Sequence, residues 1–370
     1  MAPIWQLVDS SGIGGIEKHI LVLAQTLKAQ GLDVRVVLLA PHDNNPWLDQ
    51  LTMAGLPFTI LEGGLKGLWR GLSAERPALV HSHGYKAGIL GRLACRARGI
   101  PVVSTYHAGE AGPFPVSLYQ TLDAYTGLLA RRISVSRPIA ARLPYASTVI
   151  ENFINCPAMD TNRPLSRTVA FVGRLSHEKG PDLFCDFAAQ QPRRPTLDWH
   201  LYGDGPMRPE LEAKYGSLIE FHGMVSNLEP IWPTLGLIVL SSRAEGLPLV
   251  ALEAMAHGVP VLAPRLGGLP DLIQHGVTGW LYDPEDLTDM SRAFRQWVQA
   301  RPAFLTQMRT NCQQRIRSHY SPAAKLPLIL DVYRNAGLRL TSSPTSPPTT
   351  GTASPPTGSS HLPVQGPARR

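Results

Sequence analysis

Two glutamates in one block of the sequence have the type and spacing of residues that could do chemistry. Glu245 and Glu253 lie in EGLPLVALEAMAHG, where apolar residues recur at helical spacing and Pro248 suits the first helical turn. A glycosidase pair needs carboxyl groups about 5 to 9.5 Å apart, whereas eight helical residues span roughly 12 Å. We therefore expect the two carboxylates to hold different parts of one elongated ligand. The plainer alternative, that Glu253 is a charge on a helix surface, stays open.

Two cations stand at the end of another expected strand. The block VGRLSHEKG places Arg174 at the end of the run 168–175 and Lys179 just beyond it. Cations at the carboxyl end of a strand are suited to neutralising a diphosphate. A solvated, charged loop is the alternative interpretation of this block.

Glycine-rich turns follow two more of the apolar runs. SSGIGGIEKH contains Gly14 and Gly15, and YGDGP contains Gly203. Such glycines let backbone N–H groups approach an anion at a helix N-terminus. The first turn is not a dinucleotide fingerprint, because Glu17 stands where the third glycine should be. This departure disfavours an NAD-dependent dehydrogenase, and a tight turn without a ligand remains an alternative.

The elements that must position these residues are short apolar runs alternating with helix-like stretches. Continuous apolar runs indicate strands that are buried on both faces of a parallel sheet. The pattern predicts the α/β class, with two Rossmann-like doubly wound domains facing across a cleft that binds the ligand. The runs lie at 4–8, 34–40, 78–80, 101–105, 133–135, 148–150, 168–175, 199–202, 219–221, 236–240 and 260–263.

The chain of 370 residues is long enough for two domains and a tail. We expect an N-terminal domain at 1–151, a connection at 152–167 that is rich in Asn and Pro, and a C-terminal domain at 168–340. The last 30 residues, 341–370, consist of Pro, Ser, Thr and Gly at 22 positions. Because this tail has few apolar side chains to bury, we expect it to be disordered.

Charge is distributed unevenly between the two halves. Residues 1–150 carry 14 basic and 9 acidic side chains, whereas residues 151–340 carry 19 of each. The stretch 66–98 has seven basic residues against one acidic residue. No nucleic-acid-binding motif accompanies this charge, so we expect an anionic membrane surface as a partner rather than nucleic acid. An ordinary solvated basic face is the alternative.

Metal and redox chemistry find no support in residue spacing. The four cysteines are far apart, and no His, Asp or Glu set has the spacing of metal ligands. We therefore expect no metal and no other cofactor. No run is long enough to span a membrane and no secretion signal opens the chain, which predicts a cytoplasmic protein that can dock on the inner face of the membrane.

Taken in order and spacing, four blocks resemble the retaining GT-B glycosyltransferases called family 4. They are GGIEKH, VGRLSHEKG, GDGP and EGLPLVALEAMAHGVPVLAP, and the resemblance covers about residues 3–337. It implies a sugar nucleotide held mainly by the C-terminal domain and an acceptor on the N-terminal one, with a last helix that can return to the N-terminal domain.

The resemblance also assigns roles to individual residues. It implies that Arg174 and Lys179 grip the donor diphosphate, that Glu253 binds the ribose hydroxyls and that Glu245 contacts the donor sugar. Gly14 and Gly15 match the loop near the diphosphate and the acceptor, and the backbone of Gly246, Leu247 and Pro248 lies beside the sugar. His107, in VVSTYHAGE, matches the histidine near the reacting carbon. We also expect Gly203, in the GDGP block, to contact the donor, because its turn permits close approach of a ligand.

The function that the resemblance implies is transfer of a hexose-type sugar from a UDP- or GDP-sugar without a metal. The implied acceptor is a glycan or a lipid-pyrophosphate-linked glycan of a bacterial surface polysaccharide, such as lipopolysaccharide, capsule or exopolysaccharide. A sugar-nucleotide epimerase or phosphorylase of the same fold, and a non-catalytic nucleotide-sugar-binding protein, are the alternatives. The intact pair of glutamates, together with Arg174 and Lys179, favours transfer.

Overall fold

The apolar runs of the first half form a seven-stranded sheet whose neighbours are all parallel. The strand order is β3-β2-β1-β4-β5-β6-β7 in the computed structural model, which describes residues 2–107, 116–159 and 163–339. The predicted tail therefore lies outside the described residues. The strands are β1 (Ile4–Val8), β2 (Val34–Leu38), β3 (Phe58–Ile60), β4 (Leu79–His83), β5 (Val102–Tyr106), β6 (Arg131–Ser134) and β7 (Thr148–Val149).

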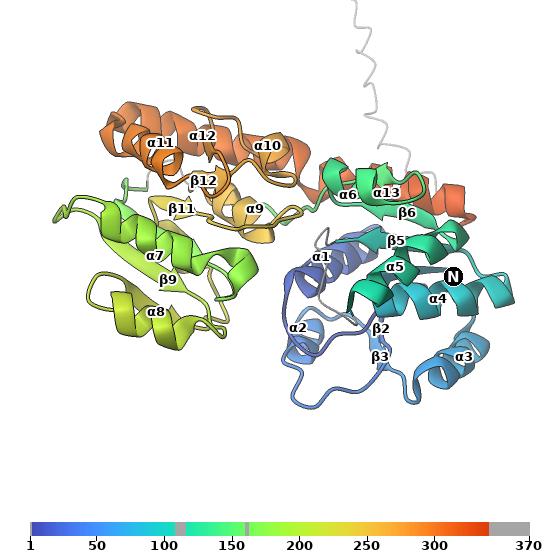
Figure 1. Cartoon of the computed structure of the whole chain (residues 1–370). Coiled ribbons are helices and arrows are strands. Elements are labelled where there is room, and N and C mark those ends of the chain that lie inside the picture. The colour runs from blue at the N-terminus through green and yellow to red at the C-terminus, as the bar shows by residue number, and fades with distance from the viewer. Residues whose placement is uncertain (1, 108–115, 160–162, 340–370) are drawn as a thin grey trace, which may run out of the picture. The chain divides into compact units, whose positions relative to one another are not determined.

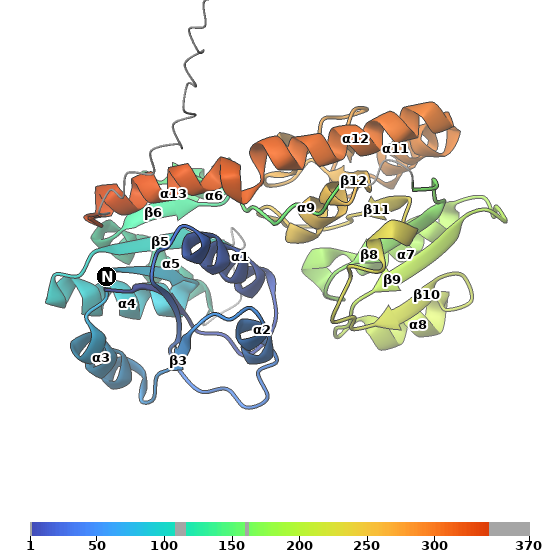
Figure 2. The same ribbon diagram turned by 180° about the vertical axis from the view of Figure 1, so that it is seen from behind.

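Helices cover both faces of this sheet, as a parallel sheet requires. Helices α1 and α13 pack against each other on one face, and α3, α4 and α5 form a contiguous layer on the other (Figures 1 and 2). The helices of this half are α1 (Gly15–Ala29), α2 (Trp47–Met53), α3 (Gly64–Glu75), α4 (Tyr85–Arg98), α5 (Val116–Thr126) and α6 (Arg137–Arg142), with a 3-10 turn at Gly127–Leu129.

The second half repeats the architecture with a six-stranded parallel sheet in the order β10-β9-β8-β11-β12-β13. Its strands are β8 (Thr168–Val172), β9 (Asp198–Tyr202), β10 (Glu220–Gly223), β11 (Leu237–Val239), β12 (Val261–Pro264) and β13 (Gly279–Tyr282). Its helices are α7 (Pro181–Gln190), α8 (Arg208–Tyr215), α9 (Leu249–Ala256), α10 (Leu269–Leu272), α11 (Leu287–Gln299) and α12 (Pro302–His319), with 3-10 turns at His177–Lys179 and Trp232–Thr234.

The two parallel sheets confirm the predicted fold class of two Rossmann-like domains. Two strands were not predicted, β3 and β13. Strand β3 has only three residues, all half-buried, and β13 begins with a glycine, so neither forms the long apolar run that marks a buried strand. The sheets span residues 4–149 and 168–282, while the domain limits at 151 and 168 stay a prediction.

The last two helices belong to different halves of the protein. Helix α12 packs on α9, whereas α13 (Pro322–Ala336) packs on α1, β5 and β6. The break between the two helices falls where Ser321 accepts a hydrogen bond from the Ala324 N–H and Pro322 begins the new helix. No helix in the described part of the chain is long and apolar enough to cross a membrane.

The structure corrects one member of the predicted basic stretch. Arg92 is completely buried, and its guanidinium lies 2.5 Å from the Asp123 carboxylate. It also donates to Ser104 Oγ and to the Asp123 carbonyl. Arg92 is therefore a core residue that joins α4 to α5 and cannot contribute to a basic outer surface.

We expect Arg92→Gln to destabilise the protein by about 3 to 5 kcal/mol, because it leaves the buried Asp123 carboxylate without its cation. Urea unfolding measures the loss. Arg96→Gln on the same helix is the matched control, since Arg96 is exposed, and it should change the free energy of unfolding by less than about 0.5 kcal/mol. Equal effects of the two changes would contradict the structural role of Arg92.

Candidate active site

The candidate residues gather where strand order reverses in each sheet. In the first sheet the reversal lies between β1 and β4, and in the second it lies between β8 and β11. The loops that follow these strands diverge there and leave room for a ligand at the carboxyl edge. The loop after β1 contains Gly14, the loop after β8 contains Arg174, and the loop after β11 contains Glu245.

Glu245 is held by one cation and one hydroxyl. Its side chain is only 5% exposed, and its Oε1 lies 2.9 Å from Lys179 Nζ. The same oxygen accepts a 2.7 Å hydrogen bond from Ser242 Oγ. The structure thus brings Glu245 together with Lys179, 66 residues apart in sequence. A nearly buried carboxylate needs such partners.

The backbone behind this pair is packed too tightly for a side chain at one position. A Cβ on Gly180 would lie 2.0 Å from the Ser241 carbonyl oxygen, and Gly180 has φ +64°. Ser241 Oγ in turn donates to the Gly180 carbonyl at 2.6 Å. Only glycine fits here, and the contact fixes the residue after Lys179 against the loop that carries Glu245.

Arg243 is a positioning residue that the sequence analysis did not single out. Its guanidinium donates twice to the Asp182 carboxylate, at 2.9 and 2.6 Å. These bonds lower the pKa of Asp182. They join the start of α7 to the loop that contains Glu245. No sequence motif marks a bidentate pair of this kind. The only sign in the sequence was an arginine next to the block that contains Glu245.

Arg174 lies on the same edge of the second sheet and is exposed. No hydrogen bond or ion pair of its guanidinium occurs within the described residues. Burial alone would raise the pKa of the nearby Glu178, but a hydrogen bond from Ser176, with Arg174 and Lys179 adding to it, lowers the value below its usual range. This local excess of positive charge suits an anionic ligand.

Gly203 packs against the same strand end. A Cβ on Gly203 would lie 1.8 Å from the Gly173 carbonyl oxygen, and the Leu175 N–H donates to the Asp204 carbonyl at 2.9 Å. The GDGP loop is therefore seated directly on the segment that carries Arg174. Gly203 is therefore required because the two backbone segments approach too closely to leave room for a side chain.

Glu253 forms an ion pair with a residue of the first half. Its Oε1 lies 2.7 Å from Lys18 Nζ on α1. Helix α1 begins directly after Gly14, with Gly15 as its first residue, so the glycine turn and Glu253 are linked through Lys18. Lys18 was not predicted as a site residue, although it belongs to the block GGIEKH.

The loop between β11 and α9 also contacts the first half. A Cβ on Gly246 would lie 2.9 Å from the His107 carbonyl oxygen, which places His107 beside the glutamate block. The Leu247 carbonyl accepts a 2.9 Å hydrogen bond from Asn152 Nδ2. Pro248 was expected in the first helical turn but precedes it, because its ψ of 129° is extended and α9 begins at Leu249.

The side chain of His107 lies against two other histidines, His19 and His83. His19 lies on α1 and His83 ends β4. His83 Nδ1 lies 3.1 Å from His107 Nε2, and the His19 and His107 ring centroids are 4.9 Å apart. Burial lowers the pKa of His19 to about 4 and, with reinforcement from neighbouring imidazoles, lowers those of His83 and His107 well below the usual value. These rings are neutral at pH 7.

The structure also brings together metal-ligating side chains that sequence spacing did not reveal. Each of His19, His83 and His107 offers a nitrogen within 4.8 Å of the others, and His200, Glu220 and His222 form a second such group. The sequence analysis identified neither group, because the members of the first come from separate segments and His200 of β9 joins Glu220 and His222 of β10 only through strand pairing. Neutral imidazoles could bind a transition metal, so the expected independence from metals stays a proposal.

Two family models match the chain. Residues 166–300 match the model described as Glycosyl transferases group 1, and residues 13–156 match the model described as Glycosyltransferase Family 4. Among curated proteins, D-inositol 3-phosphate glycosyltransferase of Pseudarthrobacter chlorophenolicus is 28% identical, over 77% of this chain and 82% of the relative. The enzyme of the same name from Mycolicibacterium smegmatis is 25% identical, over 79% of this chain and 80% of the relative.

Solved structures share the fold. HepE of Anabaena, in complex with UDP-glucose, has a TM-score of 0.77 at 18% identity and covers 90% of this chain and 99% of its own. Sucrose-phosphate synthase of Thermosynechococcus elongatus has a TM-score of 0.75 at 19% identity, over 90% of this chain and 99% of its own. At these identities the likeness concerns the fold.

The buried histidines predict that stability falls as pH is lowered from about 7 towards 5. In the unfolded chain these imidazoles take up a proton near their usual pKa, whereas the folded protein binds it only at lower pH. Protons therefore favour the unfolded state. The melting temperature should decrease over this range, and less steeply in His19→Gln.

His319→Gln, which replaces an exposed histidine, should leave that slope unchanged. A melting temperature that is constant between pH 7 and 5 would show that the histidine cluster is charged or accessible.

Proposed function

The chain belongs to glycosyltransferase family 4, and on that premise we propose that it transfers a hexose-type sugar, with retention of configuration, from a UDP- or GDP-sugar. Glycosyltransferase activity itself follows from the family and from its curated relatives. The observation that carries the finer proposal is the convergence of Lys179 and Glu245, 2.9 Å apart, with Arg174 on the same sheet edge. His107 lies against the same loop, beside Gly246.

These residues can divide the work of transfer between charge and hydrogen bonding. Lys179 and Arg174 neutralise the donor diphosphate, on which negative charge grows as the sugar departs. A diphosphate competes with Glu245 for the Lys179 ammonium. Glu245 Oε1 can then accept a hydrogen bond from a sugar hydroxyl while it keeps the one from Ser242 Oγ. Glu253 accepts from the ribose hydroxyls, and the N-terminus of α9 adds its partial positive charge.

Retention fits attack on the same face of the sugar that the diphosphate leaves. A donor phosphate oxygen is then close enough to take the acceptor proton, so no further protein base is needed. The cations already present can perform the electrostatic work of a metal, and we therefore propose a metal-independent reaction.

For the acceptor we propose a glycan or a lipid-pyrophosphate-linked glycan of a surface polysaccharide. A phosphorylated inositol is the second candidate, because the curated relatives named above carry that acceptor in their names. Both acceptors are anionic or lie beside an anion, which suits the basic first half of the chain.

The proposal predicts turnover with a UDP- or GDP-sugar that persists in EDTA and falls about 10²–10³-fold in Glu245→Gln and in Lys179→Met, since each change removes a preorganised electrostatic contact. Release of UDP or GDP in the presence of each acceptor measures the rate. Glu210→Gln is the control, because Glu210 is an exposed residue of α8.

Three outcomes would contradict parts of this proposal. Near-normal turnover in both variants would remove Glu245 and Lys179 from the site. A strict requirement for added Mg²⁺ or Mn²⁺ would refute metal independence. Conversion of the donor in the absence of any acceptor would instead identify an epimerase.

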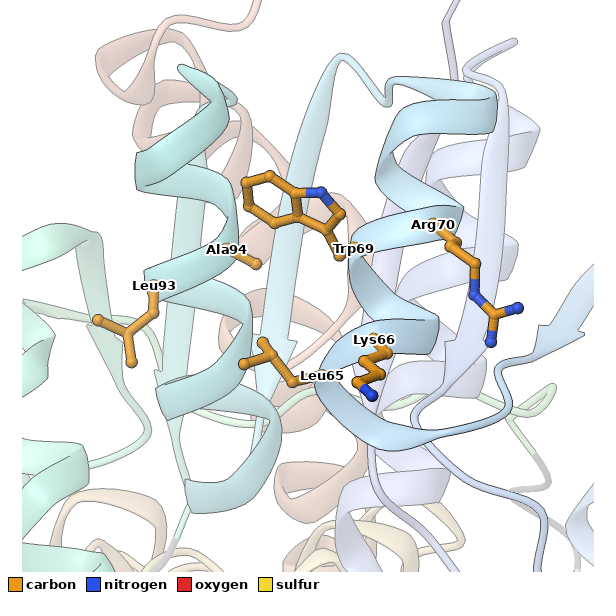
Figure 3. Close-up of a pocket in the computed structure, with 6 residues that line it drawn as sticks. All are labelled: Leu65, Lys66, Trp69, Arg70, Leu93 and Ala94. Atoms are coloured by element: carbon orange, nitrogen blue, oxygen red, sulfur yellow. The ribbon is translucent and has the colours of Figure 1, made fainter.

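The outer layer of the first half carries an apolar groove. The groove, of about 720 Å³, lies between α3 and α4 and is lined by Leu65, Lys66, Trp69, Arg70, Leu93 and Ala94. Figure 3 shows Leu65 and Trp69 pointing towards α4, while Arg70 extends from α3 away from it. Eight large apolar side chains of α3, α4 and α5 are exposed, and so is Leu128 of the 3-10 turn that follows α5. The eight are Leu65, Trp69, Tyr85, Leu93, Leu118, Tyr119, Leu122 and Tyr125.

The charge that borders this groove is positive. The two acidic residues of α3, α4 and α5 are both paired, Glu75 with Arg35 at 2.8 Å and Asp123 with the buried Arg92. Lys66 and Arg70 are exposed, and the Arg98 guanidinium lies 3.9 Å from the Trp69 ring centroid. Exposed large apolar side chains beside basic ones are typical of an interaction surface.

We propose that this layer docks on an anionic lipid bilayer. Apolar side chains can enter the acyl boundary while Lys66 and Arg70 contact lipid phosphates, at about 1 kcal/mol per basic residue close to the surface. The buried Arg92 takes no part in this docking surface, whose basic residues lie mainly on α3. Docking there would bring a lipid-linked acceptor to the first half of the enzyme.

We expect binding to vesicles that contain anionic lipid, weakened by salt. The double variant Lys66→Gln/Arg70→Gln should bind about ten-fold more weakly or worse, because two contacts with lipid phosphates are lost. Co-sedimentation measures binding. Arg193→Gln/Arg194→Gln, at two exposed arginines of the second half, is the matched control. Equal binding to neutral and anionic vesicles, or none to either, would contradict the proposal.

A further inference from the structure

A continuous chain of buried side chains runs from His107 to the last helix. His107 Nε2 meets His83 Nδ1 at 3.1 Å, and His83 Nε2 meets Gln6 Oε1 at 2.9 Å. Gln6 Nε2 donates to the Tyr333 hydroxyl at 3.3 Å, and that hydroxyl lies 2.8 Å from His81 Nδ1. The intermediate side chains come from β1, β4 and α13, and all are at most 1% exposed.

The direction of each hydrogen bond beyond Gln6 follows from its amide nitrogen. That nitrogen can only donate, so the Tyr333 oxygen accepts from it and directs its own O–H to His81 Nδ1. His81 then carries its proton on Nε2, which faces Thr105 Oγ1 at 2.7 Å. Gln6 Nε2, the Tyr333 hydroxyl and His81 Nε2 thus each donate to the next group in the chain.

The amide oxygen of Gln6 determines in the same way which nitrogens of His83 and His107 carry a proton. An amide oxygen can only accept, so His83 must carry its proton on Nε2 and leave Nδ1 bare. His107 must then donate from Nε2 to that bare nitrogen. Because the His107 ring is neutral, its single proton is used in this bond, and Nδ1 is left as a hydrogen-bond acceptor.

We propose that Gln6 and Tyr333 are positioning residues that hold His107 in the tautomer with its proton on Nε2 and Nδ1 free to accept. This inference rests on the proposed function only in placing His107 at the reacting sugar. A hydroxyl of the donor or the acceptor can then donate to Nδ1, whereas the opposite tautomer would present an N–H there. In general, the hydrogen bond made by one ring nitrogen of a histidine decides which of the two nitrogens carries the proton.

The structure also indicates what happens when Tyr333 loses its hydroxyl. The Gln6 amide nitrogen then has no acceptor and His81 Nδ1 has no donor. Nothing holds the amide in one orientation, and a rotated amide would donate to His83 Nε2. That exchange reverses the bond between His83 and His107 and moves the His107 proton to Nδ1.

The experiment compares wild-type protein with Tyr333→Phe and Gln6→Met after labelling histidine with ¹⁵N. Long-range ¹H–¹⁵N spectra distinguish a protonated ring nitrogen from a bare one, and His107→Asn assigns the His107 signals. We expect wild-type His107 to be protonated on Nε2 and both variants to show a mixture of tautomers. In the same variants kcat should fall about ten- to hundred-fold while the donor KM changes less than two-fold.

Tyr320→Phe is the matched control. Tyr320 is also buried, and its hydroxyl donates to the Asp271 carbonyl at 3.1 Å outside the chain. It should keep the wild-type tautomer and rate, and comparison of melting temperatures separates loss of packing from loss of orientation.

Two results would overturn the proposal: wild-type His107 protonated on Nδ1, or an unchanged single tautomer in both Tyr333→Phe and Gln6→Met. Spectra are recorded without substrate, so they decide on the tautomer even if no transfer activity is found. An inactive wild-type protein with the expected tautomer would count against the proposed function alone.

Discussion

A carboxylate that is almost removed from water must be paired, and this requirement organises the second half of the protein around Glu245. Lys179 and Ser242 supply the cation and the hydroxyl donor, at 2.9 and 2.7 Å. Both partners depend on loops that must approach each other closely, which is why Gly180 lies directly on the Ser241 carbonyl. The bidentate pair of Arg243 and Asp182 then ties these loops to α7. In the proposed function, the donor diphosphate would take the place of Glu245 as the partner of Lys179.

In the first half, the buried polar cluster around His107 contains mostly neutral groups. Buried imidazoles avoid the cost of charge by staying unprotonated, but each ring then has one donor and one acceptor nitrogen to satisfy. The chain through Gln6 and Tyr333 satisfies both nitrogens of His81 and of His83 in one consistent direction, whereas the buried His19 Nδ1 has no hydrogen-bond partner among the described residues. The two halves thus offer the ligand a charged side and a neutral, oriented side.

Contiguous features of the site could be predicted from the sequence, and features assembled across elements could not. Strand runs and the block around Glu245 and Glu253 are local, so they predicted the fold correctly and pointed to the candidate carboxylates. Lys18, His83, Gln6 and Tyr333 reach the site only through sheet order and the return of α13, and no spacing along the chain encodes that. The burial of a single charged side chain could not be predicted from the sequence either. Arg92 has the same residue type as Arg96 one turn away, and only packing against α5 shows that it belongs to the core.

The division of the last two helices between the halves has a consequence for engineering chimeras. Because α13 contributes Tyr333 to the first half while α12 packs on α9, the first half is discontinuous in sequence. An exchange of the second half with that of another family member therefore needs two junctions, one within 152–159 and one at Ser321. A chimera with a single junction would combine a host sheet with a foreign α13, and the foreign helix would have to satisfy Gln6 and His81.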